Sequence, residues 1–393
     1  MTEWPHIVVA GGSIGGLTAA LLLRDLGCEV DVFERSSEAL QSRGAGIVVL
    51  PMTERYFVQQ SRTGERVSLT LTYWSYVDAE GNLLSADPDS FRFSSWNTVY
   101  RGLLDCLDPD RYHLNEEMVG FDRNADGVTV RMASGREIEA DLLVCADGTS
   151  STARRLLLPD IQPVYAGYVA WRGTVPERQL SPTTRADLVD SMLYQVLVGG
   201  HILTYAIAGQ DGAVEPGDRL INFVWYRNYP EGEDFDSVMT DVHGERRPMT
   251  VPPGMVRREH LDELRRATRA LAPTMTEVVN ESSDVFVQAI FDLESPRLVF
   301  GRVLLMGDAA FTARPHVAAG TAKASADAWA LHDALRSTHG GIDAALATWE
   351  PGQLALGRAV VDRSRRMGQS SQFEGTMVPG DPAWKFGLYE PGN

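Results

Sequence analysis

The chain has 393 residues, of which 44% are hydrophobic and 23% charged, a composition typical of a globular protein large enough for two domains. Its 36 basic and 53 acidic residues give a net charge of −17, which argues against nucleic acid or an anionic membrane as a partner. Three scattered cysteines, no signal peptide and no apolar run near the roughly 20 residues of a bilayer span predict a cytoplasmic protein without a metal site.

The N-terminal segment predicts a βαβ unit. Residues 7–10 form an apolar run that suits a buried parallel strand, and residues 17–26 place alanines and leucines at helical spacing. Residues 29–33 then predict a second strand, which Glu34 closes 18 residues after Gly16. An acid at that position is placed to accept hydrogen bonds from an adenosine ribose.

A glycine-rich turn joins the first strand to the helix. Such a turn lets a pyrophosphate approach the backbone at a helix N-terminus, where free amides and the helix dipole favour negative charge. Ser13 stands where the usual fingerprint has its second glycine, so the turn alone would also fit a purely structural role. The order of strand, turn, helix, strand and acid favours dinucleotide binding. The predicted contacts are Gly11, Ser13, Ile14, Gly16, Glu34 and Arg35.

The middle of the chain predicts hairpins and then long strands. Residues 73–84 and 128–138 each contain a turn between apolar runs, and residues 142–146 predict a buried strand that ends at Asp147 and Gly148. Four longer strands follow, and they predict a mostly antiparallel sheet with one buried face. Their expected ranges are 165–175, 192–198, 202–208 and 220–226.

The last third predicts a return to the nucleotide-binding domain. A helix is expected at 257–271 and a strand at 285–291, and the strand 303–306 ends at Gly307 and Asp308. Helices at 322–335 and 342–367 follow. The tail is rich in proline and glycine, but its aromatic residues are costly to leave in water, so we expect it to pack.

These elements predict three parts of the chain. A discontinuous nucleotide-binding domain comprises 1–72, 95–162 and 285–367, a sheet domain that binds the substrate comprises 73–94 and 163–284, and the packed tail comprises 368–393.

Several spaced motifs resemble those of the FAD-dependent aromatic hydroxylase family. By that resemblance, the segment Gly44, Ala45, Gly46 and Ile47 lines the isoalloxazine, and Arg101 lies near the FAD phosphates. Asp147 and Gly148 resemble the family's middle motif, and Gly307 and Asp308 resemble its ribityl-binding motif. The loop that the family places beside the flavin would contribute Pro315, Ala318, Ala319 and Gly320.

Within the family, the chain resembles the 2,6-dihydroxypyridine 3-hydroxylase branch. The similarity includes residues 165–173, 314–325 and 382–388, whereas residues 52–73 match poorly and leave the substrate open. The implied fold is α/β and similar to para-hydroxybenzoate hydroxylase: a Rossmann-like FAD-binding domain, an inserted antiparallel β-sheet domain and C-terminal helices.

The resemblance also implies the chemistry. NADH or NADPH would bind transiently and reduce FAD, O2 would form a flavin C4a-hydroperoxide, and carbon 3 of 2,6-dihydroxypyridine would be hydroxylated by a homodimeric enzyme. Two alternatives stay open. One is a hydroxylase of a phenol or hydroxybenzoate, which could also remove a carboxylate; the other is a flavin-binding protein without catalytic activity.

Catalysis in this family needs a base for a ring hydroxyl, and the candidates are His201, Tyr205 and His316. His201 also fits a turn residue at a strand start, and Tyr205 also fits a core aromatic. Asp292, at a strand end, is an alternative base, and Arg172 is either a solvated sheet residue or adjacent to the site.

Overall fold

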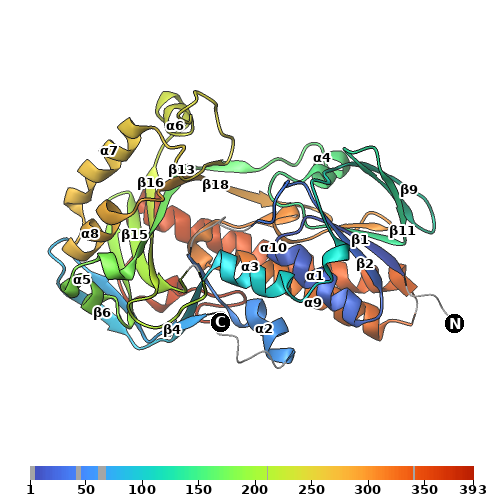
Figure 1. Ribbon diagram of the computed structural model, residues 1–393, viewed down its shortest axis with the longest axis horizontal. Coiled ribbons are helices and arrows are strands. Elements are labelled where there is room, and N and C mark those ends of the chain that lie inside the picture. The colour runs from blue at the N-terminus through green and yellow to red at the C-terminus, as the bar shows by residue number, and fades with distance from the viewer. Residues whose placement is uncertain (1–4, 41–45, 61–67, 210, 340) are drawn as a thin grey trace.

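The computed structural model describes residues 5–40, 46–60, 68–209, 211–339 and 341–393. A nine-stranded sheet lies at one end of the molecule and a five-stranded sheet at the other, and the long helix α10 (Gly341–Gln369) reaches from one to the other (Figure 1). Among the described residues, no helix combines the length and apolarity that a bilayer span requires.

The five-stranded sheet is parallel, in the order β19-β12-β1-β2-β8. Ile7, Val8 and Val9 are fully buried because helices cover the sheet, and α1 (Ile14–Asp25) packs against α9 (Gly320–Ser337). The strands are β1 (His6–Ala10), β2 (Glu29–Glu34), β8 (Tyr112–Leu114), β12 (Leu142–Cys145) and β19 (Val303–Leu305).

An antiparallel sheet of β9 (Met118–Arg123), β10 (Val128–Met132) and β11 (Glu137–Ala140) connects β8 to β12. The predicted turn around Gly135 lies between β10 and β11, and Gly135 has a φ of 88° that favours glycine.

The nine-stranded sheet is antiparallel except where β14 pairs with β5. It therefore agrees with the predicted mostly antiparallel sheet. Its strands are β5 (Tyr73–Val77), β6 (Leu83–Asp87), β13 (Val164–Pro176), β14 (Ser191–Leu197), β15 (Gly200–Ile207), β16 (Leu220–Asn228), β17 (Thr250–Val251), β18 (Phe286–Glu294) and β20 (Phe311–Thr312).

Two parts of the sheet assignment differ from the predicted boundaries. Strand β18 was expected in the nucleotide-binding domain, but it pairs with β13 in the nine-stranded sheet. Residues 73–94 were assigned to the sheet domain, but strand β7 (Phe91–Ser95), most of which falls in that range, pairs with β3 (Gly46–Val48) and β4 (Leu69–Leu71) in a separate small sheet. An apolar strand pattern predicts a strand but not its partner, so pairing decided both cases.

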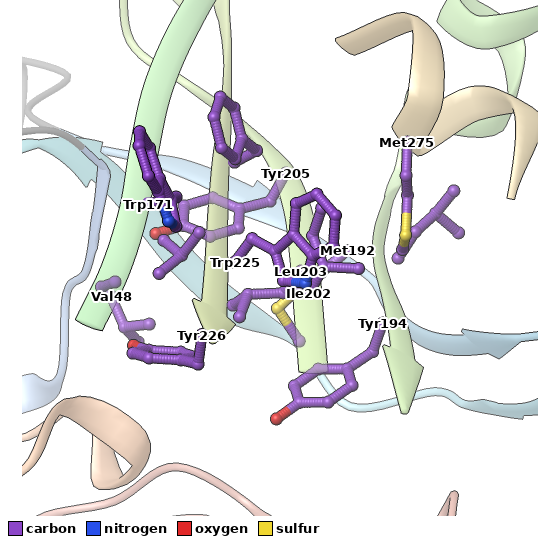
Figure 2. Packing of buried hydrophobic residues seen from close by; sticks show 14 of the residues in the cluster. Val48, Trp171, Met192, Tyr194, Ile202, Leu203, Tyr205, Trp225, Tyr226 and Met275 are labelled. Carbon is purple, nitrogen blue, oxygen red and sulfur yellow. The ribbon is translucent and has the colours of Figure 1, made fainter. Parts of the chain in front are cut away.

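Helix α8 (Pro273–Glu281) packs on the outer face of β13, β15 and β16, where Met275 is fully buried (Figure 2). The tail packs as well, because Met377, Phe386 and Leu388 are buried. The remaining helices are α2 (Pro51–Gln59), α3 (Trp96–Leu104), α4 (Thr152–Leu157), α5 (Pro182–Asp187), α6 (Glu233–Val238) and α7 (Arg258–Ala267).

Candidate active site

Two cavities hold most of the predicted site residues. The first, of about 730 Å³, lies at the carboxyl ends of β1, β2 and β12, where parallel sheets bind their ligands. The second, of about 1040 Å³, lies between the nine-stranded sheet and the loop that precedes α9. It is lined by Gly46, Ile47, Val48, Trp96, Arg172, Tyr194, His201, Leu203, Tyr205, Val224, Tyr226, Asp308, Ala313, Arg314, Pro315, His316, Ala318, Ala319, Gly320, Thr321 and Phe386.

The glycine-rich turn forms one wall of the first cavity. Gly11 has a φ of 103°, and a Cβ there would lie 2.3 Å from the Ala146 carbonyl oxygen. A Cβ on Gly16 would lie 1.9 Å from the Gly11 oxygen, so neither position admits a side chain. Gly11 and Ser13 line the cavity, whereas Ile14 and Gly16 lie behind its surface and pack the helix against the strand.

Two carboxylates complete the first cavity. Glu34 accepts hydrogen bonds from the Gly12 amide, at 3.0 Å, and from Ser36, so it also holds the turn. Asp147 accepts from the Thr152 amide at 2.7 Å, but its Oδ1 is buried without a partner among the described residues. Burial raises the pKa of Asp147. Asp147, Gly148 and the exposed Arg35 line the cavity, and an unpaired acceptor there suits a ligand with hydroxyl groups.

A buried ion pair supports the Gly307 turn. The Gly307 amide donates to Asp327 at 2.8 Å, and the Lys323 ammonium donates to the same Asp327 oxygen at 2.7 Å. The Asp308 side chain lines the second cavity, where desolvation raises its pKa and the Lys323 charge opposes the rise. Arg154, which is 1% exposed, joins the middle motif to this turn by donating to the carbonyls of Thr149 and Ala309.

The backbone of Gly46 is held from both sides by the nine-stranded sheet. Its amide donates to Asn222 Oδ1 at 2.9 Å, and its carbonyl accepts from Arg172 Nη2 at 2.7 Å. A Cβ on Gly46 would lie 2.8 Å from Tyr205, so only glycine fits this approach. Arg172 is therefore adjacent to the site. Ile47 lines the second cavity, and the predicted residues Gly44 and Ala45 lie outside the described residues.

The alternation of side chains along the strands selects the residues that face the second cavity. Arg172 pairs with Val224, Val224 with Leu203, and Leu203 with Tyr194, so these four residues form one row across four strands. The side chains of Tyr226 and Trp225 point to opposite faces of the sheet, as Figure 2 shows, and Tyr226 is the one that lines the cavity. Tyr205 lies two residues beyond Leu203, on the same face.

His201 and His316 meet in this cavity, with their ring centroids 5.2 Å apart. His201 stacks on Tyr194, and its Nδ1 lies 3.3 Å from the Gln372 amide nitrogen. His316 Nε2 lies 2.6 Å from the Tyr168 hydroxyl.

Both histidines are uncharged near neutral pH. Burial, together with the neighbouring His316, holds the pKa of His201 well below 6.5. Burial and the Arg314 charge lower the pKa of His316 to about 3. Burial also raises the pKa of Tyr205 to about 12, so its hydroxyl stays protonated.

The loop before α9 closes the other side of the cavity. Ala318 has a φ of 52°, a left-handed conformation that is uncommon for a residue with a Cβ, and such strain is concentrated at functional sites. Arg314 is fixed by Asp292, which accepts from its Nε at 2.7 Å and also from Arg365. Asp292 is not among the residues that line the cavity, and two arginines already occupy its carboxylate, which disfavours it as the catalytic base.

The structure therefore brings all three candidate bases into one cavity. It leaves Arg101 exposed on α3 and outside the lining of both cavities, so its contact with FAD remains a prediction. Sequence reasoning missed Tyr168, Asn222 and Gln372. Asn222 had a usable signal, since a polar residue interrupts the apolar run 220–226. Gln372 had none, because it follows the last predicted helix.

The residues present fit FAD. The first cavity is lined by Glu34 and by Asp147, whose Oδ1 is buried without a partner among the described residues. Gly11 lines the first cavity and Gly46 the second, and neither position has room for a Cβ. Among the described residues, no group of three or more histidine, cysteine and acidic side chains is placed to hold a metal.

Comparisons with known proteins agree with this site. A family model described as FAD binding domain-like matches residues 165–292. The 2,6-dihydroxypyridine 3-monooxygenase of Paenarthrobacter nicotinovorans is 39% identical over 98% of this chain and 96% of its own length.

Solved structures agree as well. The structure of 2,6-dihydroxypyridine-3-hydroxylase from Arthrobacter nicotinovorans superposes with a TM-score of 0.93 at 38% identity, over 99% of this chain and 98% of that one. Klebsiella pneumoniae HpxO, solved with FAD and uric acid, has a TM-score of 0.76 at 25% identity, over 94% and 89% of the two chains.

Proposed function

Because the chain belongs to the family of FAD-dependent aromatic monooxygenases, we propose that it hydroxylates 2,6-dihydroxypyridine at carbon 3, with NADH or NADPH as the reductant. One atom of O2 would enter the ring and the other would leave as water, with two electrons from the reductant. The relatives named above are monooxygenases or hydroxylases, which removes the alternative of a flavin-binding protein without catalytic activity.

Bound FAD supplies the activation of O2 and the transfer of one oxygen atom. The chain's own residues would hold it in three places. The turn of Gly11 and Ser13 receives the pyrophosphate, Asp308 binds the ribityl chain, and the clamped backbone of Gly46 lies against the ring system.

The observation that best supports a hydroxylated ring as substrate is the pairing of neutral bases with a cationic side chain in one cavity. Arg172, whose Nε is buried without a partner among the described residues, favours an anionic ring, and His201 and His316 are uncharged and can take the proton that creates it. The apolar side chains of Val48, Leu203, Val224 and Phe386 surround that position and exclude water.

We assign the base to His201. The Gln372 amide lies against its Nδ1, and Gln372 Oε1 is buried without a partner among the described residues. With the amide turned so that this oxygen accepts from Nδ1–H, Nε2 is the nitrogen left to take the substrate proton. His316 is less suited, because the Tyr168 hydroxyl occupies its Nε2 and its Nδ1 is buried, without a partner among the described residues, and so is not open to a ligand.

The substrate proposal is tested by NADH consumption in air by the FAD-loaded protein, with and without 2,6-dihydroxypyridine. We expect stimulated consumption and a product heavier by one oxygen atom, about 16 Da. Consumption without a heavier product would contradict the substrate assignment and leave the reaction class intact.

A hydroxybenzoate is the second candidate, because Arg172 lines the cavity and its Nε is buried without a partner among the described residues. Such a guanidinium fits a substrate carboxylate. If salicylate or 4-hydroxybenzoate is turned over and Arg172→Gln raises its KM by tenfold or more, this candidate replaces the first.

The base assignment predicts that His201→Gln lowers kcat by about 10² to 10⁴-fold, the usual contribution of a general base. The loss should shrink at high pH, where the substrate hydroxyl ionises without help. His243→Gln, at an exposed histidine, is the control. An unchanged kcat in His201→Gln, or a loss that does not change with pH, would remove the assignment.

We also propose that the protein is a cytoplasmic homodimer, as expected for the branch. Light scattering on the FAD-loaded protein tests the dimer, which a mass near 43.2 kDa would contradict.

A further inference from the structure

A third cavity, of about 1290 Å³, lies on the other side of Arg314 from the substrate cavity. It is formed by the C-terminal end of α10 and the tail. Arg314 lines both cavities, so the two are neighbours. The residues around the third cavity are Arg314, Arg363, Arg365, Arg366, Met367, Gln369, Ser370, Glu374, Ala383, Trp384 and Pro391.

The lining is cationic in a protein whose net charge is −17. Arg314 and Arg365 are compensated, because both donate to Asp292, and Arg365 also reaches Glu294. Glu374 is the single carboxylate among the lining residues. Because Arg314 and Arg365 are paired with carboxylates, the positive charge of the cavity comes from Arg363 and Arg366.

Arg363 and Arg366 lack anionic partners. Arg363 Nη2 donates to the Gly387 carbonyl, but its Nε and Nη1 are buried without a partner among the described residues. Arg366 is exposed and makes no ion pair with any residue that the structure describes. Buried guanidinium donors without acceptors are costly. Burial lowers the pKa of Arg363, and the neighbouring Arg366 charge lowers it further.

The chemistry of this site selects its ligand class. Paired guanidinium groups match the oxygens of phosphate better than any other common anion. Trp384 supplies an aromatic surface beside them, and its Nε1 is buried without a partner among the described residues. A ligand that combines phosphate with an aromatic ring could therefore bind both the guanidinium groups and the Trp384 ring.

We propose that this cavity binds the reducing dinucleotide, with its pyrophosphate on Arg363 and Arg366 and an aromatic ring against Trp384. The choice of dinucleotide rests on the proposed function, which needs a reductant, and the sequence contains no second glycine-rich nucleotide fold. The position of Arg314 between the two cavities brings this ligand next to the place where the flavin ring would lie.

The test is a calorimetric titration of the FAD-loaded protein with ADP-ribose, which carries the pyrophosphate but cannot reduce flavin, and with inorganic pyrophosphate. We expect Arg363→Gln/Arg366→Gln to weaken binding of both by tenfold or more. Arg366→Gln alone, at an exposed side chain, should weaken binding by a smaller factor. Arg258→Gln, at a side chain that is 93% exposed on α7, changes the net charge by as much as Arg366→Gln alone and should leave both affinities unchanged.

Equal affinity for ADP-ribose in the double variant and in the unmodified protein would overturn the proposal, as would no binding in either. Flavin absorbance and the melting temperature verify that each variant is folded. No aromatic substrate enters the nucleotide titration, so its outcome is independent of whether the substrate proposal holds.

Discussion

At the scale of single residues, the two buried histidines lower the free energy of unfolding by an amount that depends on pH. His316 has a pKa of about 3 in the folded protein, against 6.5 for an unperturbed histidine. Between these two values the unfolded chain binds more protons than the folded one. The free energy of unfolding therefore falls as the pH drops below 6.5, by up to about 1.4 kcal/mol per pH unit for each such histidine.

The prediction is a smaller acid sensitivity in His316→Gln. Urea unfolding at pH 7.5, 6.5 and 5.5 should show a shallower loss of stability in this variant than in the unmodified protein. His6 acts in the opposite sense, because its hydrogen bond to Asp31 raises its pKa, and it is present in both proteins. His243→Gln, at an exposed position, should keep the original slope. Identical slopes in all three proteins would contradict the buried neutral state of His316.

Single residues were predictable from the sequence where a motif fixes the backbone. Gly11, Gly46 and Asp308 lie at their expected places because a close approach or a strand end requires them there. The second carboxylate under the Gly307 turn, Asp327, lies on a helix that sequence reasoning predicted only as a helix. Asp327 contacts the turn only because of how α9 is positioned along it, and the local sequence does not predict that position.

At the scale of elements, α9 holds the Gly307 turn in place through the ion pair of Lys323 and Asp327. Lys323 and Asp327 are 3% and 0% exposed, so each charge depends on the other. Removing one partner from a buried pair costs about 3–5 kcal/mol, whereas replacing both by apolar residues is often close to neutral.

Asp327→Leu should therefore lower the free energy of unfolding by about 3–5 kcal/mol. Lys323→Met/Asp327→Leu should recover most of that stability but not the FAD content, because the Gly307 amide still lacks its acceptor. Denaturant unfolding and the ratio of flavin to protein absorbance measure the two effects separately. Full FAD content in the double variant would show that the pair has only a structural role.

Strand and helix positions followed from periodicity, but strand partners did not. The helix expected at 257–271 and the strand expected at 202–208 agree closely with α7 and β15. The transfer of β18 to the nine-stranded sheet was missed, because its apolar pattern fits either sheet.

At the scale of the whole molecule, the tail completes the substrate cavity. Phe386 is 5% exposed, lies with its ring centroid 4.5 Å from that of Trp74, and lines the cavity. The tail therefore contributes an apolar side chain to the wall of this cavity.

Phe386→Ala should lower the ratio of hydroxylated product to NADH consumed, because water reaching the site diverts the reduced flavin from the substrate. Phe386→Leu fills more of the space than alanine does, so its ratio of product to NADH consumed should lie between those of Phe386→Ala and the unmodified protein. Tyr389→Ala removes an exposed aromatic from the same tail and is the control. An unchanged ratio in Phe386→Ala, with normal FAD content, would exclude a role for the tail in sealing the site.

The fold class was recognisable because the two nucleotide motifs appear in order, almost 300 residues apart. The small sheet of β3, β4 and β7 was not, since each strand is short and its partners are distant in sequence.

The order of the parallel sheet has a consequence for how the protein is made. Strand β19 is an edge strand that joins β12 only after some 300 residues have been synthesised, and Asp308 follows directly behind it. At about 5–20 residues per second, a ribosome needs about 15–60 s to reach that point. During this interval the nascent chain has the glycine-rich turn after β1 but neither Asp308 nor α9, which packs against α1. Productive loading of the cofactor is therefore expected after translation is nearly finished, and the exposed half-sheet is where a chaperone would be needed.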